Sequence, residues 1–264
     1  MKKFMKLAAV LLAAAMLLAL CACGKEPEAE NTYKTITPGV LTVATSPDYA
    51  PYEFYAIGAD GTAELAGFDI ALIQYIADYL KLELANGSVD LGVAGISPDP
   101  DRAESMDFSD IYYEGGQAFI TVKSKADMFT DLASANTPGI SVGAQNGTIQ
   151  MDLAQQYSPD TDIVTLTKAT DIIAELVSGK LDGGYVEYDV AVAYQANYPD
   201  LHIVCEVPYD VEGNAVGVKK GNEALLEGVN KAIADCIEKG EFSQYVATAL
   251  EQASGDIFEG LIEE

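Results

Sequence analysis

Histidine and basic residues are scarce in this sequence of 264 residues. His202 is the single histidine, and 15 Lys and Arg residues stand against 41 Asp and Glu residues. A zinc site needs clustered histidine or cysteine, which the chain lacks, and with His202 alone there is no basis for a Ser-His triad, so we expect no metal, no cofactor and no triad. The net charge of −26 would repel phosphate groups, so we expect no nucleic-acid partner.

Cysteine is also rare, with four residues in two groups. Cys21 and Cys23 close an apolar segment near the N-terminus, whereas Cys205 and Cys236 lie far along the chain. In an oxidising compartment the second pair could form a disulfide, and two buried free thiols are the alternative. The spacing of these residues does not decide between the two.

The N-terminal segment has the pattern of an export signal. Residues 1–6 are basic and residues 7–20 form an apolar run, which is shorter than the roughly 20 residues that span a bilayer. The order Leu20, Ala22, Cys23 resembles the lipobox of bacterial lipoproteins and implies a lipid on Cys23, while Cys21 fits less well because Leu20 directly precedes it. We expect a lipoprotein signal peptide at 1–22 and a polar tether at 23–37.

The rest of the chain alternates strands and helices in two similar halves. In the first half we predict a strand at 41–44, a helix that starts at Asp69 and a buried strand at 89–94. The second half repeats the order at residues 140–143, 147–153, 169–177 and 181–186. Such alternation indicates an α/β fold with parallel sheets, whose ligands lie beyond the carboxyl ends of the strands.

A short internal echo links the two halves. In each, a helix end and a glycine precede an apolar residue and then an aspartate, Asp90 or Asp182. Glycine after a helix end is explained by the left-handed cap that it permits. A shared structural unit therefore accounts for the echo without common ancestry.

The turn after residues 89–94 has the groups that bind a carboxylate. It combines a hydroxyl, free backbone N–H groups and an arginine between Gly95 and Arg102. Arginine stays protonated and can hold a carboxylate with two parallel hydrogen bonds, and Ser97 supplies a further donor. The alternative is a surface arginine paired with an acid of the same turn, namely Asp99, Asp101 or Glu104.

Several stretches together resemble the family 3 extracellular solute-binding proteins, the amino-acid receptors of ABC importers. They are Thr45 to Phe54, Gly67 to Asp69, Ile96 to Tyr113, Val142 to Thr148 and Gly213 to Val216. The resemblance covers about residues 38–242 and implies a two-lobe periplasmic-binding-protein-like (type II) clamp with a ligand cleft between the lobes. It places lobe I at 38–113 plus 213–264 and lobe II at 114–212, joined by two crossing strands that act as a hinge.

The resemblance also implies roles for individual residues. Arg102 and Ser97 would bind the α-carboxylate of an amino acid, with amide donors from Gly147 and Thr148 at a helix start. Glu187 would accept the α-ammonium, where the family generally has aspartate, and Asp189 is the rival acceptor. The carbonyl of Gly95 would bind the same ammonium.

The resemblance places side-chain recognition in the first and second lobes. Tyr49 and Tyr52 match positions where aromatic rings stack on the ligand side chain, and ordinary core packing is their alternative. Ser46 and Gln145 match positions that set selectivity. Because Ser46 is uncharged, this position demands neither a cationic nor an anionic ligand.

The sequence departs from the family around residues 81–88. Here the family has a strand, a loop and a helix, and this chain has eight residues. A parallel crossover needs a dozen or more residues, so we predict that the helix from Asp69 continues to about Ala85 and that lobe I is shortened. A short strand at 82–84 is the competing prediction.

We expect the extracytoplasmic, membrane-anchored substrate-binding component of an ABC importer, a monomer that binds a free polar amino acid and presents both lobes to permease subunits. One alternative is a cyclohexadienyl dehydratase-like enzyme on this fold, with Glu187 as acid. Another is a degenerate receptor that the shortening of lobe I has inactivated. A receptor kinase or channel would need a transmembrane segment after the body, and the sequence shows none.

Overall fold

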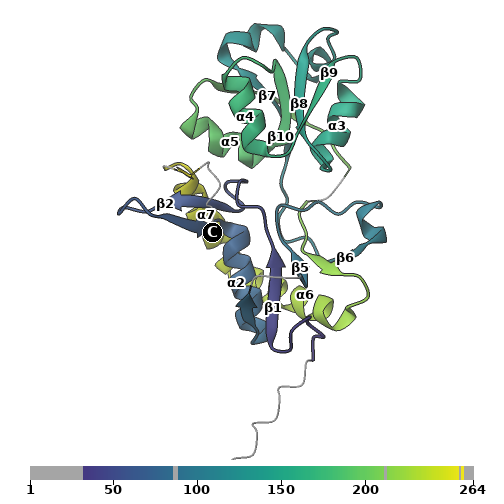
Figure 1. Cartoon of the computed structure of the whole chain (residues 1–264), viewed down its shortest axis with the longest axis vertical. Coiled ribbons are helices and arrows are strands. Elements are labelled where there is room, and N and C mark those ends of the chain that lie inside the picture. Colours follow the sequence, from purple (N-terminus) through teal and green to yellow (C-terminus); the bar gives the residue numbers. More distant parts are fainter. Residues whose placement is uncertain (1–31, 86–88, 211–212, 256, 259–264) are drawn as a thin grey trace, which may run out of the picture. The chain divides into compact units, whose positions relative to one another are not determined.

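Two five-stranded mixed sheets organise the chain, one in each lobe (Figure 1). The computed structural model describes residues 32–85, 89–210, 213–255 and 257–258. The predicted signal peptide at 1–22, Cys23 and most of the predicted tether lie outside the described residues. None of the described helices is long and apolar enough to cross a membrane.

The first lobe contains a sheet with the strand order β4-β1-β5-β12-β6. Its strands are β1 (Val40–Ala44), β4 (Glu83–Ala85), β5 (Leu91–Gly92), β6 (Met106–Phe108) and β12 (Gly217–Lys219). Strand β1 is parallel to β4 and β5, and β12 is antiparallel to β5 and β6. The helices are α2 (Phe68–Leu80), α6 (Glu223–Glu238) and α7 (Glu241–Ala253). A separate small sheet joins β2 (Phe54–Ile57), β3 (Ala63–Ala66) and β13 (Ile257–Phe258).

The second lobe contains a sheet with the order β11-β7-β10-β8-β9. Its strands are β7 (Gln117–Val122), β8 (Ser141–Gln145), β9 (Asp162–Leu166), β10 (Gly183–Glu187) and β11 (Leu201–Val207). The helices are α3 (Ile149–Tyr157), α4 (Ala169–Val177) and α5 (Tyr188–Asn197). Strands β8, β9 and β10 are parallel, whereas β7 is antiparallel to β10 and β11. The sequence predicted parallel sheets. Both sheets are instead mixed, because each contains antiparallel pairs.

Helix α2 ends earlier than the sequence predicts. It stops at Leu80, and Lys81 is its left-handed C-cap with φ of 57°. Residues 83–85 are extended and pair with β1, so the prediction of one helix to Ala85 is wrong and the short-strand alternative holds. This edge strand is present in the first lobe, and the predicted shortening of the lobe stays a prediction.

The stagger of two strands explains why the short connection suffices. Strand β4 pairs with residues 40–42 of β1, whereas β5 pairs with residues 43 and 44 on the other side. A full crossover is needed when the second strand starts level with the first. Because β5 begins beyond the end of β4, the chain does not have to return along the sheet.

The internal echo corresponds to one repeated contact. Asp90 exchanges backbone bonds with Thr42 of β1: its N–H donates to the Thr42 carbonyl at 2.8 Å, and its carboxylate accepts the Thr42 N–H at 3.1 Å. Asp182 makes the same pair with Ser141 of β8, at 2.8 and 2.9 Å. Each aspartate thus ties a buried strand to its neighbour. Asp90 also accepts the N–H of Ile36, so the end of the predicted tether is attached to the first lobe.

The two segments that connect the lobes pair with each other. Asn214 N–H donates to the Tyr113 carbonyl at 2.7 Å, and Tyr112 N–H donates to the Asn214 carbonyl at 3.0 Å. Gly213 has φ of 138°, and a Cβ there would lie 2.3 Å from the Tyr113 carbonyl oxygen. The crossing therefore requires glycine at this position.

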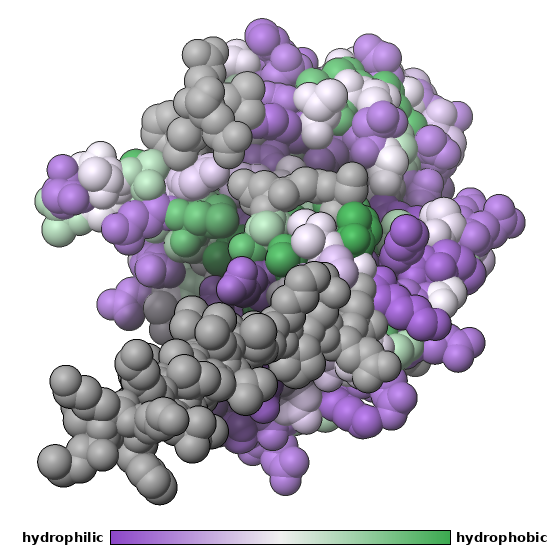
Figure 2. Space-filling view, turned by 60° about the horizontal axis from the view of Figure 1, so that its bottom comes forward, coloured by the Kyte–Doolittle hydropathy of each residue, from purple (hydrophilic) through white to green (hydrophobic). Residues whose placement is uncertain are grey.

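The core and the surface separate clearly. Buried aromatic residues bridge the elements of each lobe, with Phe68 between Tyr52 and Phe242 in the first and Phe119 beside Tyr185 in the second. Hydrophilic residues predominate on the face in Figure 2, with limited hydrophobic stretches between them. Cys205 and Cys236 are both free thiols.

Candidate functional site

A cavity of about 310 Å³ is lined by residues of both lobes. Its first-lobe wall comes from the segment after β1 and from the turn after β5, and its second-lobe wall comes from the end of β8 and the start of α3. Seven of the predicted site residues line it, namely Ser46, Tyr49, Gly95, Ser97, Arg102, Gln145 and Thr148. The carboxyl ends of β1, β5 and β8 thus meet at this cavity, as expected for open α/β sheets.

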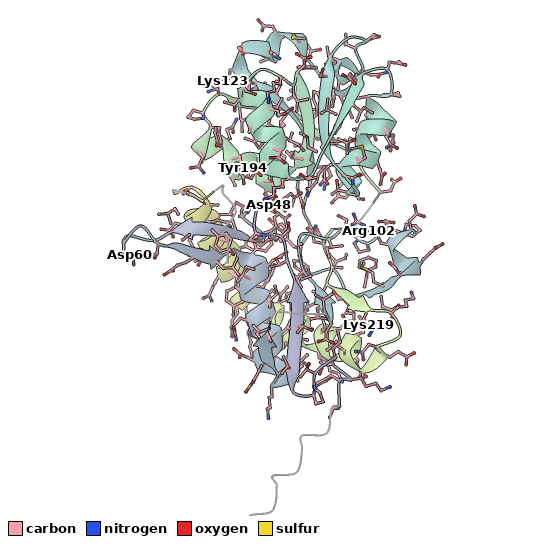
Figure 3. All side chains as sticks on the ribbon, in the orientation of Figure 1. Asp48, Asp60, Arg102, Lys123, Tyr194 and Lys219 are labelled. Carbon is pink, nitrogen blue, oxygen red and sulfur yellow. The ribbon has the colours of Figure 1, made fainter. Side chains whose placement is uncertain are left out.

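Arg102 links the two lobes at the cavity wall. It is the single arginine of the chain and begins a 3₁₀ helix. Its Nε lies 3.1 Å from Asp99, its Nη1 donates to the Ser97 carbonyl at 3.0 Å and its Nη2 donates to the Gly147 carbonyl of the second lobe at 2.7 Å. The predicted alternative, a pair with Asp99, therefore exists together with a contact across the cleft. Figure 3 shows Arg102 at the level where the two lobes meet.

The remaining donors of Arg102 define what it can still bind. A guanidinium has five N–H groups, and three of these are used by Asp99 and the two carbonyls. One N–H is left on each terminal nitrogen, and a carboxylate accepts strong hydrogen bonds from such groups. Arg102 can therefore keep its present contacts and bind an anionic group of a ligand.

The turn around Gly95 is held by the protein itself. The Gly95 N–H donates to the carboxylate of Asp69 at 2.9 Å, and its carbonyl accepts from the Asn214 side chain at 2.8 Å. Gly95 has φ of 54°, and a Cβ would approach the ring of Tyr49 to 3.1 Å. A carbonyl oxygen has a second lone pair, so Gly95 can still accept a bond from a ligand.

The start of α3 faces the same cavity. Thr148 is the N-cap residue and its hydroxyl donates to the Gln145 carbonyl at 2.8 Å. The Gln145 side chain donates to the Thr167 carbonyl at 3.0 Å. Gly147 contributes its carbonyl to Arg102 and is not among the lining residues. The positive end of the helix dipole nevertheless points towards the cavity wall, where an anion is favoured.

Tyr52 and Glu187 lie beneath the cavity and not in its wall. Tyr52 is fully buried, with its ring 4.4 Å from that of Phe68, and its hydroxyl makes a short hydrogen bond to Glu187. Tyr49 lines the cavity and donates to the other Glu187 oxygen at 3.3 Å. The ring of Tyr52 thus packs in the core, which was the alternative to stacking on a ligand. Direct ligand contact by Tyr52 or Glu187 stays a prediction.

Glu187 ends β10 and is 1% exposed. Burial raises the pKa of Glu187 to about 8, with the hydroxyl of Tyr52 acting in the opposite direction and Asp189 adding to the rise. A Cβ on Gly115 would lie 2.0 Å from a Glu187 oxygen, so only glycine leaves room for this carboxyl. The rival Asp189 instead accepts a hydrogen bond from Tyr113 at 2.8 Å.

Two further buried acids surround this group. Asp69 and Glu53 are both fully buried, and no ion pair with Lys or Arg is found for either among the described residues. Burial raises the pKa of Asp69 to about 6 and places the pKa of Glu53 well above its ordinary value, with the charge of Asp69 adding to the latter. The floor of the site is therefore acidic and poor in counter-charges.

The sequence prediction missed three polar residues that line the cavity. They are Asp48, Glu53 and Gln150. Gln150 donates to the Tyr49 hydroxyl at 3.3 Å and to Gln117 at 2.8 Å. Asp48 and Glu53 lie inside the stretch Thr45 to Phe54 that carried the family resemblance, so the signal was available for both. For Gln150, on the first turn of α3, its place just after Thr148 was the available signal.

Known proteins are similar to this chain in sequence and in fold. The chain is 29% identical to the arginine-binding extracellular protein ArtP of Bacillus subtilis over 92% of its length and 96% of the relative. A crystal structure of the amino acid ABC transporter substrate-binding protein AbpA from Streptococcus pneumoniae, bound to L-arginine, has a TM-score of 0.77 and 30% identity over 83% of this chain and 97% of that one. An ancestral amino-acid-binding protein described as a precursor of cyclohexadienyl dehydratase has a TM-score of 0.71 and 26% identity over 80% and 96%.

These relatives are binding proteins with the two-lobe type II fold, and the fold of this chain is the same. The sequence profile of the bacterial extracellular solute-binding proteins, family 3, matches residues 41–251. This match covers most of the chain and includes every element that lines the cavity. The chain belongs to the bacterial extracellular solute-binding proteins, family 3.

Proposed function

We propose that this chain is the substrate-binding component of an ABC importer and holds a free, polar amino acid between its lobes. The observation that carries the proposal is the position of Arg102, which lines the cavity, contacts the second lobe and keeps two N–H groups for a carboxylate. An amino acid bound there would be held by both lobes at once. Its carboxylate would face Arg102, Ser97 and the start of α3.

The ammonium of the ligand would lie at the acidic floor of the site. Tyr49 connects the cavity wall to Glu187 by a hydrogen bond of 3.3 Å, and Gly95 offers its carbonyl beside Tyr49. A cation placed there would favour the ionised form of Glu187, whose pKa burial raises to about 8 and which has no basic partner among the described residues. Burial of several charge-assisted hydrogen bonds is sufficient for micromolar affinity, about −8 kcal/mol.

The same geometry supports a binding protein over an enzyme. A dehydratase would need its proton donor against the substrate. Glu187 lies below Tyr49 and Tyr52, outside the cavity wall, where it supports the two tyrosines. We therefore propose no catalytic residue.

The location and partners follow from the family and from the N-terminal sequence. An extracellular solute-binding protein works in the periplasm or at the cell surface, and its ligand passes to permease subunits. We propose residues 1–22 as a signal peptide, a lipid on Cys23 and a monomer that presents lobe I (38–113 and 213–264) and lobe II (114–212) to the permease.

The test is a thermal-shift panel of the twenty amino acids on the full chain, followed by calorimetry of the best ligand. A ligand at about 100 times its Kd adds about 2.7 kcal/mol to the free energy of unfolding. Arg102→Ala should abolish this binding because it removes the carboxylate donors, whereas its melting temperature without ligand should stay close to that of the unchanged chain.

Lys123→Ala is the matched control because it removes one positive charge from an exposed position of the second lobe, away from the cavity (Figure 3). It should bind as the unchanged chain does. Retention of full affinity by Arg102→Ala would refute the assignment, and a panel without any amino-acid response would refute the function and favour the degenerate receptor.

A further inference from the structure

One part of the cavity wall is acidic and incompletely hydrogen-bonded. Asp48 and Glu53, both from the segment between β1 and β2, line the cavity. The Asp48 Oδ2 atom and both carboxyl oxygens of Glu53 are buried, and no hydrogen-bond partner is found for them among the described residues. Buried carboxyl oxygens of this kind are costly unless a donor reaches them. The wall is therefore incomplete without a donor group.

The local structure fixes the direction of the Asp48 carboxylate. Its Oδ1 accepts the hydroxyl of Ser46 at 2.7 Å, which leaves Oδ2 as the oxygen without a protein partner. Burial is the main cause that raises the pKa of Asp48, and the Ser46 hydroxyl lowers it. Ser46 thus holds the Asp48 carboxylate in place. Although Ser46 itself is uncharged, this end of the site contains an acid.

The charges around the cavity leave Asp48 without a close counter-ion. Arg102, the lining cation, is already paired with Asp99 at 3.1 Å. Lys168 of the second lobe is the basic group whose charge acts on Asp48, Asp171 opposes it, and the described residues show no ion pair between Lys168 and Asp48. Asp48 and Arg102 lie apart along the junction of the lobes in Figure 3. One can thus hold the carboxylate of a ligand while the other contacts its side chain.

We infer that Asp48 is the residue that selects the ligand side chain and that it selects a positively charged one, a guanidinium or an ammonium. The inference rests on the proposed function. An apolar side chain would leave Oδ2 buried and unpaired, and a neutral amide or ureido group would supply a donor without a charge, whereas a cationic side chain would supply both a donor and a positive charge. Glu53 lies in the same wall with a pKa well above its ordinary value, because burial and the neighbouring Asp69 raise it, so Asp48 is the acid on which the inference rests.

The first experiment uses two ligands of nearly equal shape on the unchanged full chain. L-Citrulline has the length and plane of L-arginine, with a neutral ureido group in place of the guanidinium. Calorimetry should show L-arginine binding about tenfold more tightly or better, which corresponds to about 1.4 kcal/mol. Because this comparison needs no variant, it does not depend on the folding of one.

The second experiment removes the charge and keeps the shape. Asp48→Asn should lower the affinity for L-arginine by about tenfold or more and change the affinity for L-citrulline by less than about threefold. Asp60→Asn is the matched control because Asp60 is exposed on the β2–β3 turn, away from the cavity (Figure 3). It should leave both affinities unchanged.

A third variant separates ligand recognition from a bond between the lobes. If Asp48 acted by pairing with Lys168 when the lobes close, Lys168→Met would lower the affinity for both L-arginine and L-citrulline. The inference predicts instead that Lys168→Met leaves the affinity for L-arginine equal or higher, because a competing cation is removed.

The outcomes distinguish the two proposals. Equal affinity for L-arginine and L-citrulline, or an equal loss of both in Asp48→Asn, would overturn the assignment of Asp48 while leaving an amino-acid receptor. Preference for L-glutamine or L-glutamate in the panel would overturn it in the same way. Binding of no amino acid at all would overturn both the inference and the proposed function.

Discussion

The carboxyl of Glu187 is the most strongly constrained group at the residue scale. It is buried at the end of β10, it accepts hydrogen bonds from Tyr52 and Tyr49, and the acids Asp189 and Asp69 lie close enough to raise its pKa. A carboxyl with a raised pKa favours the folded state when it is protonated. Stability from Glu187 is therefore full below the unfolded pKa, near 4.5, and is lost as the pH rises through about 8.

Glu187→Gln should flatten this pH dependence. Glutamine keeps an oxygen for the Tyr52 hydroxyl and carries no charge at any pH. Between about pH 5 and pH 8.5 the free energy of unfolding should fall for the unchanged chain and fall less for the variant, with a difference of about 1.4 kcal/mol for each unit of pKa shift that is removed. Urea titrations at both pH values measure this.

Glu64→Gln provides the comparison for that experiment, because Glu64 is exposed on β3 and its loss changes the net charge equally. It should follow the unchanged chain. Burial raises the pKa of Asp69 to about 6, so part of the fall in the free energy of unfolding with rising pH should remain in every variant. An identical pH dependence in Glu187→Gln and the unchanged chain would show that Glu187 is ionised in the folded state across this range.

Some residues of the site were predictable from the sequence and others were not. Arg102 and Ser97 follow a buried strand, and the end of a strand is where α/β sheets place ligand groups. Tyr52 was ambiguous, because the same ring suits a cavity wall and a core. Asp48 was not predicted: its N–H donates to the Ser46 carbonyl at 2.7 Å, so residues 46–48 form a tight turn and the two-residue alternation of a strand does not place its side chain.

At the scale of elements, the boundary between α2 and β4 carries the main correction. The apolar residues of α2 continue at helical spacing to Leu84, so periodicity alone favoured a longer helix. The pairing of β4 with β1 is a contact between distant parts of the chain and leaves no local signal. The equivalence of Asp90 and Asp182 was visible as an echo, and the structure gives it a cause, since each aspartate holds the adjacent strand through its backbone N–H and its side-chain carboxylate.

Lys81→Gly tests where α2 ends. Lys81 has φ of 57°, a conformation that costs a residue with a side chain about 1 kcal/mol and costs glycine nothing. The variant should therefore raise the free energy of unfolding by up to about 1 kcal/mol, measured by urea denaturation. In a helix that continued to Ala85, glycine at this position would lower it by about the same amount.

Lys81→Ala is the control for the lost charge and side chain. It keeps the cost of a positive φ, so its stability should stay within about 0.5 kcal/mol of the unchanged chain. The sign of the difference between the glycine and alanine variants decides the question. A less stable glycine variant would contradict a helix end at Leu80.

At the scale of the whole molecule, the lobes share one chain that crosses between them. The predicted parallel sheets became mixed because β12 returns to the first sheet antiparallel to β5 and β6, and β7 enters the second sheet antiparallel to β10. Alternation of helices and strands predicts the parallel units correctly. It does not reveal the strands that follow a crossing, since these pair with partners far along the chain.

The net charge of the whole chain should act on the ligand before it arrives. A charge of −26 attracts a cationic amino acid and is screened by salt, and hydrophilic residues predominate on the face in Figure 2. If the ligand is cationic, raising NaCl from about 20 mM to about 500 mM should lower the affinity for L-arginine several-fold, because the screening length falls well below the size of the protein. The affinity for neutral L-citrulline should change much less, and calorimetry at the two salt concentrations measures both.

The Asp48→Asn variant should keep part of this salt effect, because the remaining acids still attract the ligand. Equal salt dependence for the two ligands would show that the field of the chain does not act on the bound side chain, and a stronger loss for L-citrulline would contradict the direction of the field itself.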